Sequence, residues 1–380
     1  EHISGLRLIR SYGIETLAEE SFAKDAEAAS DANLAVASAE AKYEPVIIIT
    51  MGASFLLAVG GGGWLIQMDE FSVGELTRFT LYLGQLIWPM FAYGWLLNLL
   101  KRGAVSYQRI QEVLKAPTDM EDNGEKSLSA SADIRWNISA YRYPETDYDA
   151  LSGFSGQLLP KRILGIVGPT GAGKSTFLQL LLRQYESPCV TVQLDGSALQ
   201  DYPLESIHQH FAVVPQEPFL FSSTVAENIR LGKPTASDED IRAAAEMAAV
   251  HDDIMRLPKG YNTEVGERGV TLSGGQKQRL SIARALLRDA PVLVLDDALS
   301  AVDVATERRI LHQLKKQRGD RAMIIVCHRL TAVENADETV VLRQGQAVER
   351  GSHQQLMANN GWYADAYRYQ QLEQAVVEGH

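Results

Sequence analysis

Residues 168–175, GPTGAGKS, constrain this chain more than any other stretch. They fit the pattern G-x-x-x-x-G-K-[ST], in which glycines let successive backbone N–H groups turn inward around phosphate oxygens. The apolar run 163–167 before them is typical of a strand, and the run 176–182 after them is typical of a helix. A helix N-terminus favours anions. The order strand, loop, helix therefore predicts a phosphate-binding loop and a bound nucleotide, rather than a plain glycine turn.

The pattern also assigns individual contacts. Lys174 is expected to reach the β- and γ-phosphates, and the hydroxyl of Ser175 to ligate Mg²⁺. ATP and Mg²⁺ are therefore the expected cofactors. The expected ATP contacts in this stretch are Gly168, Pro169, Thr170, Gly171, Ala172, Gly173, Lys174, Ser175 and Thr176.

Length and charge limit the other possibilities. A chain of 380 residues has room for two or three domains. The 36 basic against 48 acidic residues give a net charge of −12, which argues against nucleic acid as a partner. Cys189 and Cys327 lie far apart in strand-like runs, so we expect two small buried side chains rather than a disulfide.

Two uncharged runs lie before the nucleotide-binding part, at residues 45–68 and 79–100. Each is long enough to cross the ~30 Å hydrocarbon core as a helix. A pair of buried helices in a soluble protein is the alternative. Length and three aromatic residues near the ends of the runs favour two membrane spans: Trp64, Trp88 and Trp95.

Charges beside the runs predict their orientation. Basic residues lie on their outer sides: Lys42, Lys101, Arg102 and Arg109. Acidic residues occupy the connection between them: Asp69, Glu70 and Glu75. By the positive-inside rule the outer flanks are cytoplasmic. The nucleotide-binding part is then cytoplasmic too.

Polar and small residues within the runs leave alternatives open. The glycines 60–63 permit either close helix approach or local unwinding, and a loosely packed helix end is the other interpretation. Gln85 and Asn98 are expected to face a helix interface or a cavity rather than lipid. Residues 1–44 are expected to form a long helical segment that extends into the cytoplasm. Residues 111–133 are expected to be a linker.

A second motif identifies the kind of ATPase. The residues Leu272, Ser273, Gly274, Gly275 and Gln276 spell LSGGQ, which resembles the signature of ABC ATPases. It again places open backbone amides and a serine hydroxyl at a helix N-terminus, which suits a phosphate. The resemblance implies that this phosphate belongs to a nucleotide held by the opposite domain. It thus implies a head-to-tail dimer.

Further residues match ABC motifs in order along the chain. Asp296 ends an apolar run, as in the Walker B strand, and the resemblance implies that it holds Mg²⁺ through water. Asp297 stands where the family usually has the glutamate that polarises the attacking water. Asp303 lies in a segment similar to the D-loop, which crosses the dimer interface in the family.

Three more residues complete the set. Gln216 resembles the Q-loop glutamine that contacts Mg²⁺ and senses the γ-phosphate, and His328 resembles the switch histidine. Tyr143 resembles the A-loop tyrosine that stacks on adenine, with Tyr141 and Tyr148 as competing candidates. The implied catalytic residues are therefore Asp297, His328 and Gln216.

The resemblance covers the whole chain and is to an ABC exporter half-transporter of the bacterial multidrug-resistance-like type. The segment 264–269 is similar to one that touches the cytoplasmic loops of the membrane domain in exporters. We therefore expect the last two spans of a type IV ABC exporter domain (1–110), a linker (111–133) and an α/β phosphate-loop ABC ATPase domain (134–380). Four earlier spans are missing, so we expect the chain to be a fragment of a multi-pass protein of the bacterial inner membrane.

Asp297 departs from the family pattern because aspartate is one methylene shorter than glutamate. A base must lie within ~2.6–3.2 Å of the proton it takes, and a misplacement of about 1 Å can cost about 10²-fold in rate. The resemblance therefore implies a weakly hydrolytic site here and a heterodimer with a second half-transporter that supplies the faster site. A homodimer with two slow sites is the alternative.

The expected function is ATP-driven export of small amphipathic, drug-like compounds, with membrane lipid and a second half-transporter as partners. Export of lipids or peptides, and a mainly regulatory subunit with slow hydrolysis, are the alternatives. A soluble ABC ATPase is a further class, and the two uncharged runs argue against it.

Overall fold

The structure is a computed structural model that describes residues 5–116, 120–129, 132–266, 272–317 and 319–378. The chain divides into two compact units, Glu1–Pro117 and Thr118–His380.

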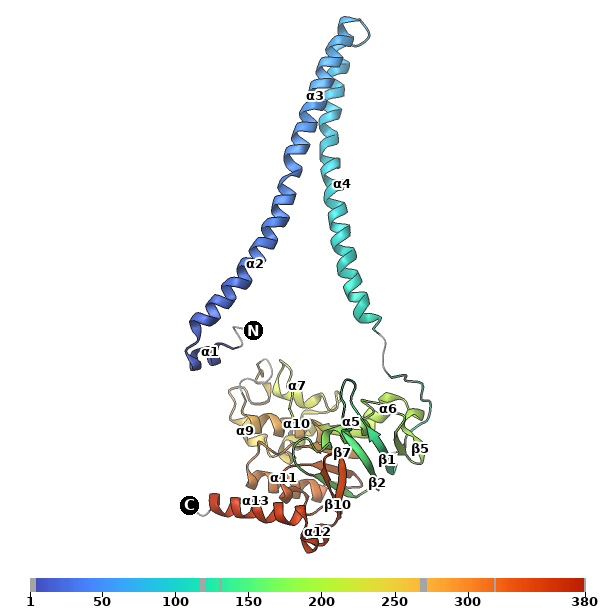
Figure 1. The fold of residues 1–380 in the computed structure, drawn as a ribbon, viewed down its shortest axis with the longest axis vertical. Helices are drawn as coiled ribbons and strands as arrows, with labels where there is room; N and C mark the ends of the chain where they lie inside the picture. Colours follow the sequence, from blue (N-terminus) through green and yellow to red (C-terminus); the bar gives the residue numbers. More distant parts are fainter. Residues whose placement is uncertain (1–4, 117–119, 130–131, 267–271, 318, 379–380) are drawn as a thin grey trace. The chain divides into compact units, whose positions relative to one another are not determined.

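The first unit is helical (Figure 1). Ser72 caps its last helix, because its hydroxyl accepts a hydrogen bond from the Glu75 backbone N–H while the Glu75 carboxylate accepts from the Ser72 N–H. That helix continues well past the second uncharged run. The helices are α1 (Leu6–Tyr12), α2 (Glu15–Ala41), α3 (Tyr43–Gln67) and α4 (Val73–Leu114).

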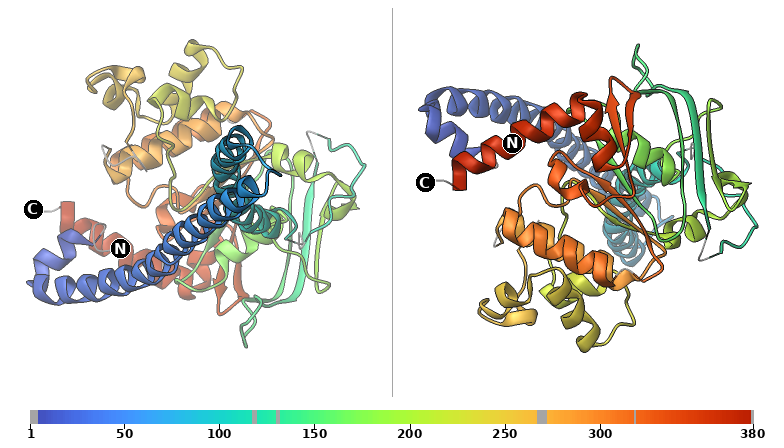
Figure 2. Two further views of the ribbon diagram at one scale, coloured as in Figure 1. Left: turned by 90° about the horizontal axis from the view of Figure 1, so that it is seen from above. Right: turned by 90° about the horizontal axis from the view of Figure 1, so that it is seen from below.

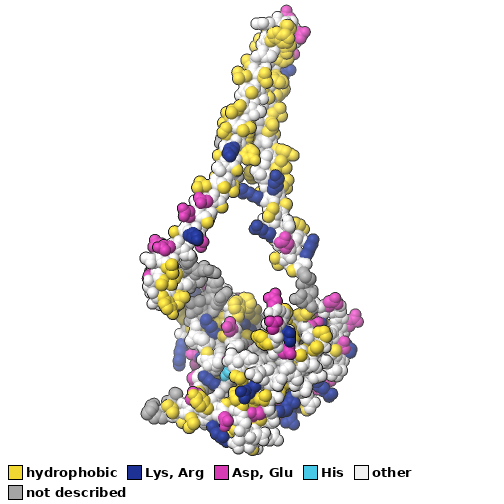
Figure 3. All heavy atoms as spheres, viewed as in Figure 1, with side chains coloured by type: hydrophobic (Ala, Val, Ile, Leu, Met, Phe, Trp, Pro, Cys, Tyr) yellow, Lys and Arg dark blue, Asp and Glu magenta, His cyan; other side chains and the backbone are white. Residues whose placement is uncertain are grey.

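Apolar side chains cover the outside of α3 and α4 (Figure 3). Among the described helices, one is long and apolar enough to cross a membrane by length and hydropathy, at Pro45–Gln67. The run 79–100 lies inside α4, and its mean hydropathy is too low to meet the same criterion. Gln85, Pro89 and Asn98 lower its mean hydropathy. A second span there stays a prediction.

The glycines 60–63 all lie within α3, so local unwinding, one of the three alternatives, does not occur. Close approach does occur, at one of them. A Cβ atom on Gly62 would collide with the side chain of Leu76 on α4, whereas Gly60, Gly61 and Gly63 have open space. The sequence could not show which of the four glycines faces the neighbouring helix.

A six-stranded sheet forms the centre of the second unit, in the order β10-β9-β3-β8-β7-β6. Neighbours pair in parallel except β10 with β9. The central strands consist of apolar residues because both of their faces are buried. The strands are β3 (Ile163–Val167), β6 (Phe211–Val214), β7 (Val292–Asp296), β8 (Ala322–Val326), β9 (Glu338–Arg343) and β10 (Gln346–Gly351).

A four-stranded antiparallel sheet lies beside it, in the order β2-β1-β4-β5. In both views of Figure 2, this sheet and helices α7–α9 lie on opposite sides of the unit. The strand β1 alternates buried and exposed residues, as expected for a sheet with one covered face. The strands are β1 (Ile134–Tyr141), β2 (Leu151–Leu158), β4 (Val190–Leu194) and β5 (Ser197–Ala198).

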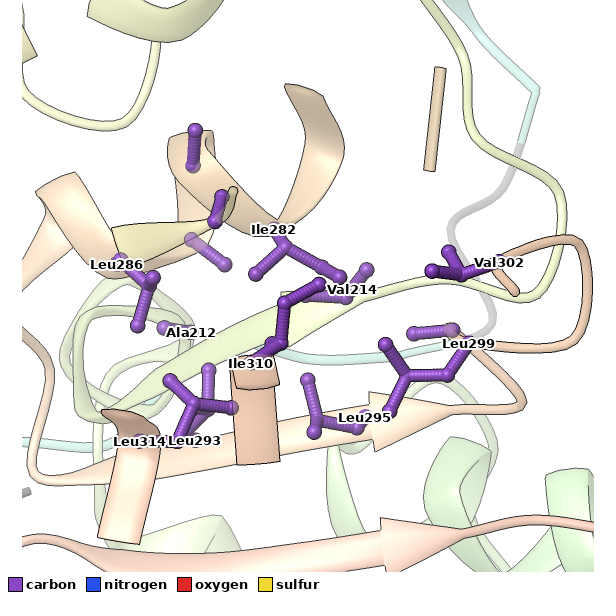
Figure 4. Close-up of a cluster of buried hydrophobic side chains, with 14 of the residues drawn as sticks. Ala212, Val214, Ile282, Leu286, Leu293, Leu295, Leu299, Val302, Ile310 and Leu314 are labelled. Atoms are coloured by element: carbon purple, nitrogen blue, oxygen red, sulfur yellow. The ribbon is translucent and has the colours of Figure 1, made fainter. Parts of the chain in front are cut away.

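Helices pack against the larger sheet through apolar side chains. Figure 4 shows Leu293 and Leu295 of β7 meeting Ile310 of α11 and Ile282 of α10 in one buried cluster. The helices of this unit are α5 (Lys174–Leu181), α6 (Leu204–His210), α7 (Val225–Arg230), α8 (Asp238–Met247), α9 (His251–Met255), α10 (Gly274–Arg288), α11 (Val304–Gln317), α12 (His353–Asn359) and α13 (Trp362–Glu378), with short 3-10 helices η1 (Leu199–Asp201), η2 (Gly260–Asn262) and η4 (Leu330–Val333).

The segment expected to be a linker, 111–133, is partly structured at both of its ends. The first residues of this segment, 111–114, belong to α4. Residues further on pack on the second unit: Arg183 donates to the Glu121 carbonyl at 2.7 Å, and the Leu204 N–H donates to Asp122 at 2.8 Å. The chain therefore joins the ATPase unit before its first strand.

The two cysteines differ in burial. Cys327 is buried and Cys189 is exposed, and both are free thiols. The expectation that Cys189 is buried is wrong because it lies in the turn before β4 and not within a strand.

Candidate ATP-binding site

The phosphate loop connects β3 to α5 and depends on glycine at two points. Gly168 and Gly173 have φ angles of 147° and 96°, which favour glycine. A Cβ atom on Gly173 would also lie 2.6 Å from the carbonyl oxygen of Ala150. The loop can therefore wrap tightly before α5 begins at Lys174.

Lys174 is held inside this loop. Its Nζ donates hydrogen bonds to the carbonyl oxygens of Gly168 at 2.9 Å and Pro169 at 3.0 Å. Burial lowers the pKa of Lys174, and the nearby carboxylates of Asp297 and Asp296 oppose that shift. The ammonium group is thus pre-positioned for an anion at the helix N-terminus.

A pocket of about 560 Å³ opens in front of the loop. It brings together residues from six separate segments of the chain. Sequence-predicted residues in its wall are Tyr143, Tyr148, Thr170, Gly171, Ala172, Gly173, Lys174, Ser175, Thr176, Gln216, Asp296, Asp297 and His328.

Ser175 and Asp296 face each other across the pocket floor. The Ser175 hydroxyl donates to Oδ1 of Asp296 at 3.5 Å. Burial raises the pKa of Asp296, and Asp297 raises it further, while the Ser175 hydroxyl and Lys174 lower it. A divalent cation would relieve this crowding of carboxylates, and hydroxyl, carboxylate and amide oxygens are the donors that Mg²⁺ prefers. Ser175, Asp296 and the nearby Gln216 therefore fit a magnesium ion.

Asp297 and His328 lie on neighbouring strand ends. The Asp297 N–H donates to the carbonyl of Val326 at 2.8 Å, and its φ of 45° places the residue in the left-handed region. Burial lowers the pKa of His328, and the cationic Lys174 lowers it further, while Asp297 opposes the shift. The imidazole is therefore neutral at neutral pH and can accept or donate a hydrogen bond.

Tyr143 lines the pocket. Its hydroxyl lies 3.1 Å from Oγ1 of Thr176 and donates to Oε1 of Gln179 at 2.5 Å. Tyr141 is 4% exposed and packs in the core, so it does not line the pocket. Tyr148 also lines the pocket and is exposed.

The signature residues form the start of α10. Ser273 is its N-cap: the Ser273 hydroxyl accepts from the Gln276 N–H at 3.3 Å, and the Ser273 N–H donates to the Gln276 side chain at 3.0 Å. None of the five signature residues, 272–276, is among the described residues that line the phosphate pocket.

The D-loop segment, residues 300–303, packs on the signature helix. The Gln278 side chain accepts from the Ala301 N–H at 2.9 Å and donates to the Ser300 hydroxyl at 3.0 Å. Asp303 does not line the pocket either. It caps α11, where it accepts from the Thr306 N–H at 2.9 Å. Of the exporter-like segment 264–269, residues 267–269 lie outside the described residues.

Five pocket residues were not anticipated from the sequence: Asp149, Ala150, Val326, Gln344 and Gly345. Gln344 and Gly345 form the turn between β9 and β10, with φ angles of 48° and 78°. Two consecutive positive φ angles are typical of a type I′ hairpin turn. The dipeptide Gln-Gly was the available signal for the turn, but nothing in it indicated proximity to the phosphate loop.

A largely parallel sheet in which a phosphate loop, Asp296 and His328 meet at one pocket, with the LSGGQ segment outside that pocket, is the arrangement of an ABC-type ATP-binding domain. The comparisons agree. The family described as "ABC transporter" matches residues 151–300, and that described as "ABC transporter transmembrane region" matches residues 1–90. The chain belongs to the ABC transporters, and it joins sequence of the transmembrane region to an ATP-binding domain.

Several known proteins are similar over nearly the whole chain. The "Multidrug resistance-like ATP-binding protein MdlA" of Escherichia coli is 46% identical over 376 residues, which are 99% of this chain and 64% of the relative. The "ATP-dependent lipid A-core flippase" of Pseudomonas aeruginosa is 37% identical, over 99% of this chain and 62% of the relative.

A solved structure described as a bacterial Atm1-family ABC exporter with ATP bound is also similar. Its TM-score is 0.87 at 31% identity, and the match covers 97% of this chain and 65% of that chain. The chain thus spans just under two thirds of the length of each of these three relatives.

Proposed function

We propose that this chain works as one half of an ATP-driven exporter in a bacterial inner membrane, with its ATPase unit in the cytoplasm. The observation that carries the proposal is the separation of Ser273 from the phosphate pocket. A signature helix whose N-terminus is not directed at its own nucleotide suits a nucleotide held by a second subunit. Two half-transporters would then form two composite ATP sites.

The pocket residues would have different roles in ATP binding and hydrolysis. The phosphate-loop amides and Lys174 would bind and orient the phosphates, and Tyr143 would stack on the base. Mg²⁺, held by Ser175, Gln216 and Asp296, would supply charge neutralisation between the phosphates. Asp297 and the neutral His328 would orient the attacking water and hydrogen-bond the γ-phosphate.

We propose a heterodimer in which this chain contributes the slower site. The Asp297 N–H donates to the carbonyl oxygen of Val326, which fixes the backbone of Asp297 at the strand end. Aspartate cannot extend as far as glutamate from this anchor. The intact signature, by contrast, equips the partner's phosphate pocket for full activity.

For the cargo, we propose small amphipathic compounds of the multidrug type. The printed name of the Escherichia coli relative at 46% identity, which refers to multidrug resistance, supports this class. The lipid A-core flippase relative favours lipid as the second candidate.

ATPase measurements on the full-length protein test the proposal, with the protein purified alone and with its partner. We expect slow hydrolysis alone and fast hydrolysis in the pair, stimulated by amphipathic drugs more than by lipids or peptides. Asp297→Asn should leave most of the activity of the pair. Fast hydrolysis by the protein alone that is unchanged in Asp297→Asn would contradict the degenerate site, and absence of ATP hydrolysis in every preparation would contradict the function.

A further inference from the structure

The C-terminal helix α13 contacts the loop that carries the switch histidine. The Gln370 side chain donates through Nε2 to the carbonyl oxygen of His328 at 2.8 Å, and its Oε1 accepts from the Leu330 N–H at 2.8 Å. We propose that Gln370 is a positioning residue for His328. The proposal rests on the ATPase function inferred above.

The two bonds fit the chemistry of a glutamine. A neutral primary amide carries both a donor and an acceptor, and here each is directed at one backbone group on either side of Arg329. Because both bonds are to backbone atoms, they restrain the path of the loop. Within the described part of the chain, no hydrogen bond holds the His328 imidazole itself, so its position depends on that path.

The helix that carries Gln370 is firmly anchored. The Glu349 carboxylate accepts from the N–H groups of Trp362 at 2.6 Å and Tyr363 at 3.3 Å, which caps the start of α13. The side chain of Tyr363 is fully buried, and its hydroxyl lies 2.9 Å from Nδ1 of His353. Gln370 therefore reaches the switch loop from a rigid support.

The same loop is held from its other side by Arg329. Its guanidinium donates to the Glu307 carboxylate at 2.7 Å and to the Val302 and Ser300 carbonyls at 2.9 Å and 3.3 Å. Glu307 is almost fully buried. The backbone around His328 is thus fixed between α13 and the D-loop, with the imidazole left facing the phosphate pocket.

The consequence concerns hydrolysis more than binding. Lys174 and the loop amides do not contact Gln370, so nucleotide affinity should survive its loss. A hydrogen-bonding group displaced by about 1 Å can lower the rate by about 10²-fold. We therefore expect Gln370→Ala to lower kcat by about 10-fold or more and to leave KM for ATP within about twofold.

The test uses the full-length pair with the catalytic acidic residue of the partner replaced by its amide, so that turnover reports the site of this chain. Gln371→Ala is the matched control, because Gln371 lies on the same helix and, among the described residues, its side chain hydrogen-bonds to Tyr367 and not to the loop of His328. Gln370→Ala should not lower kcat further in a His328→Ala background, because its effect acts through His328.

A second measurement is independent of turnover. Hydrogen exchange of the Leu330 amide should speed up in Gln370→Ala and stay slow in Gln371→Ala. Gln370→Glu keeps the acceptor for Leu330 but loses the donor for His328. We therefore expect it to keep the amide protected while kcat falls.

The outcomes separate the two proposals. No hydrolysis by the otherwise unmodified pair would reject the proposed function, and the exchange of Leu330 would still decide whether Gln370 holds the loop. An unchanged kcat in Gln370→Ala, or an equal loss in the His328→Ala background, would overturn the positioning role. Unchanged exchange at Leu330 would overturn it as well.

Discussion

The carbonyl oxygen of Ala301 in the D-loop lies 2.8 Å from the position that a Cβ atom would occupy on Gly275 of the signature helix. The two loops are therefore in backbone contact, and Gln278 joins them by hydrogen bonds to Ala301 and Ser300. The second glycine of LSGGQ, Gly275, is therefore required for packing against the D-loop within this chain, in addition to any contact with phosphate.

We expect Gly275→Ala to push the D-loop away and to destabilise the ATPase unit by about 1–3 kcal/mol. Hydrogen exchange of residues 299–302 and the thermal unfolding midpoint would show it. Gly274→Ala is the matched control, since a Cβ there would make an ordinary contact of 3.7 Å with Ala301. Equal effects of the two changes would show that the contact is unimportant.

Lengthening the carboxylate next to the magnesium site should accelerate hydrolysis. We expect Asp297→Glu to raise turnover at the site of this chain by about 10²-fold, because the added methylene brings the carboxylate within reach of the water. The measurement is ATPase activity in the pair with a silenced partner site. Asp289→Glu, at an exposed helix end, is the control. A rate below that of the unchanged protein would refute the idea of a short base.

The aromatic ring of Tyr143, rather than its hydroxyl, should bind the base. Tyr143→Ala should weaken ATP binding about 5-fold, which corresponds to about 1 kcal/mol of stacking, whereas Tyr143→Phe should keep the affinity. Photolabelling of this chain by an azido-ATP analogue at graded concentrations gives the comparison. If Tyr148→Ala has the larger effect, the stacking residue is Tyr148.

Glycine at one position of α3 should matter more than at its neighbours. Gly62→Leu should force α3 and α4 apart near Leu76 and cost about 1–3 kcal/mol, whereas Gly61→Leu points into open space within this hairpin. Thermal stability of the detergent-solubilised protein distinguishes them. A larger loss with Gly61→Leu would indicate that the packing of this hairpin does not control stability.

A buried histidine should make the ATPase unit acid-sensitive. Burial lowers the pKa of His210 to about 4, against about 6.5 in an unfolded chain. Below pH ~6.5 the unfolded state gains a proton that the folded state does not, so the free energy of unfolding falls as the pH drops toward about 4. At pH ~5 the loss is about 2 kcal/mol.

His210→Phe should flatten that pH dependence in thermal unfolding measured between about pH 7.5 and pH 5. His208→Phe, at an exposed position two residues away, should not. An unchanged slope in His210→Phe would mean that another group controls the acid sensitivity.

The sequence could predict site residues where consecutive residues form a recognisable motif. The phosphate loop lies between a strand and a helix that its own flanks predict, and Asp296 and His328 each follow an apolar run that ends at the same sheet edge. Parallel pairing of β7 with β8 and of β3 with β8 then brings them together.

Other contacts depend on long-range packing. Gln344 and Gly345 reach the pocket because β9 pairs with β3, and a sequence pattern shows a turn but not its neighbour. Gln370 likewise lies on a helix with no motif of its own. The exposed position of Cys189 follows from a strand that begins one residue later than its apolar neighbours suggest.

The bond from Gln370 to His328 spans 42 residues of sequence. During synthesis the switch histidine therefore leaves the ribosome well before the helix that holds its loop. At about 5–20 residues per second the delay is about 2 to 8 s. Once Gly345 has also emerged, the nascent chain would have every residue of the phosphate pocket but an unsupported histidine, so it could bind ATP before it could hydrolyse it efficiently.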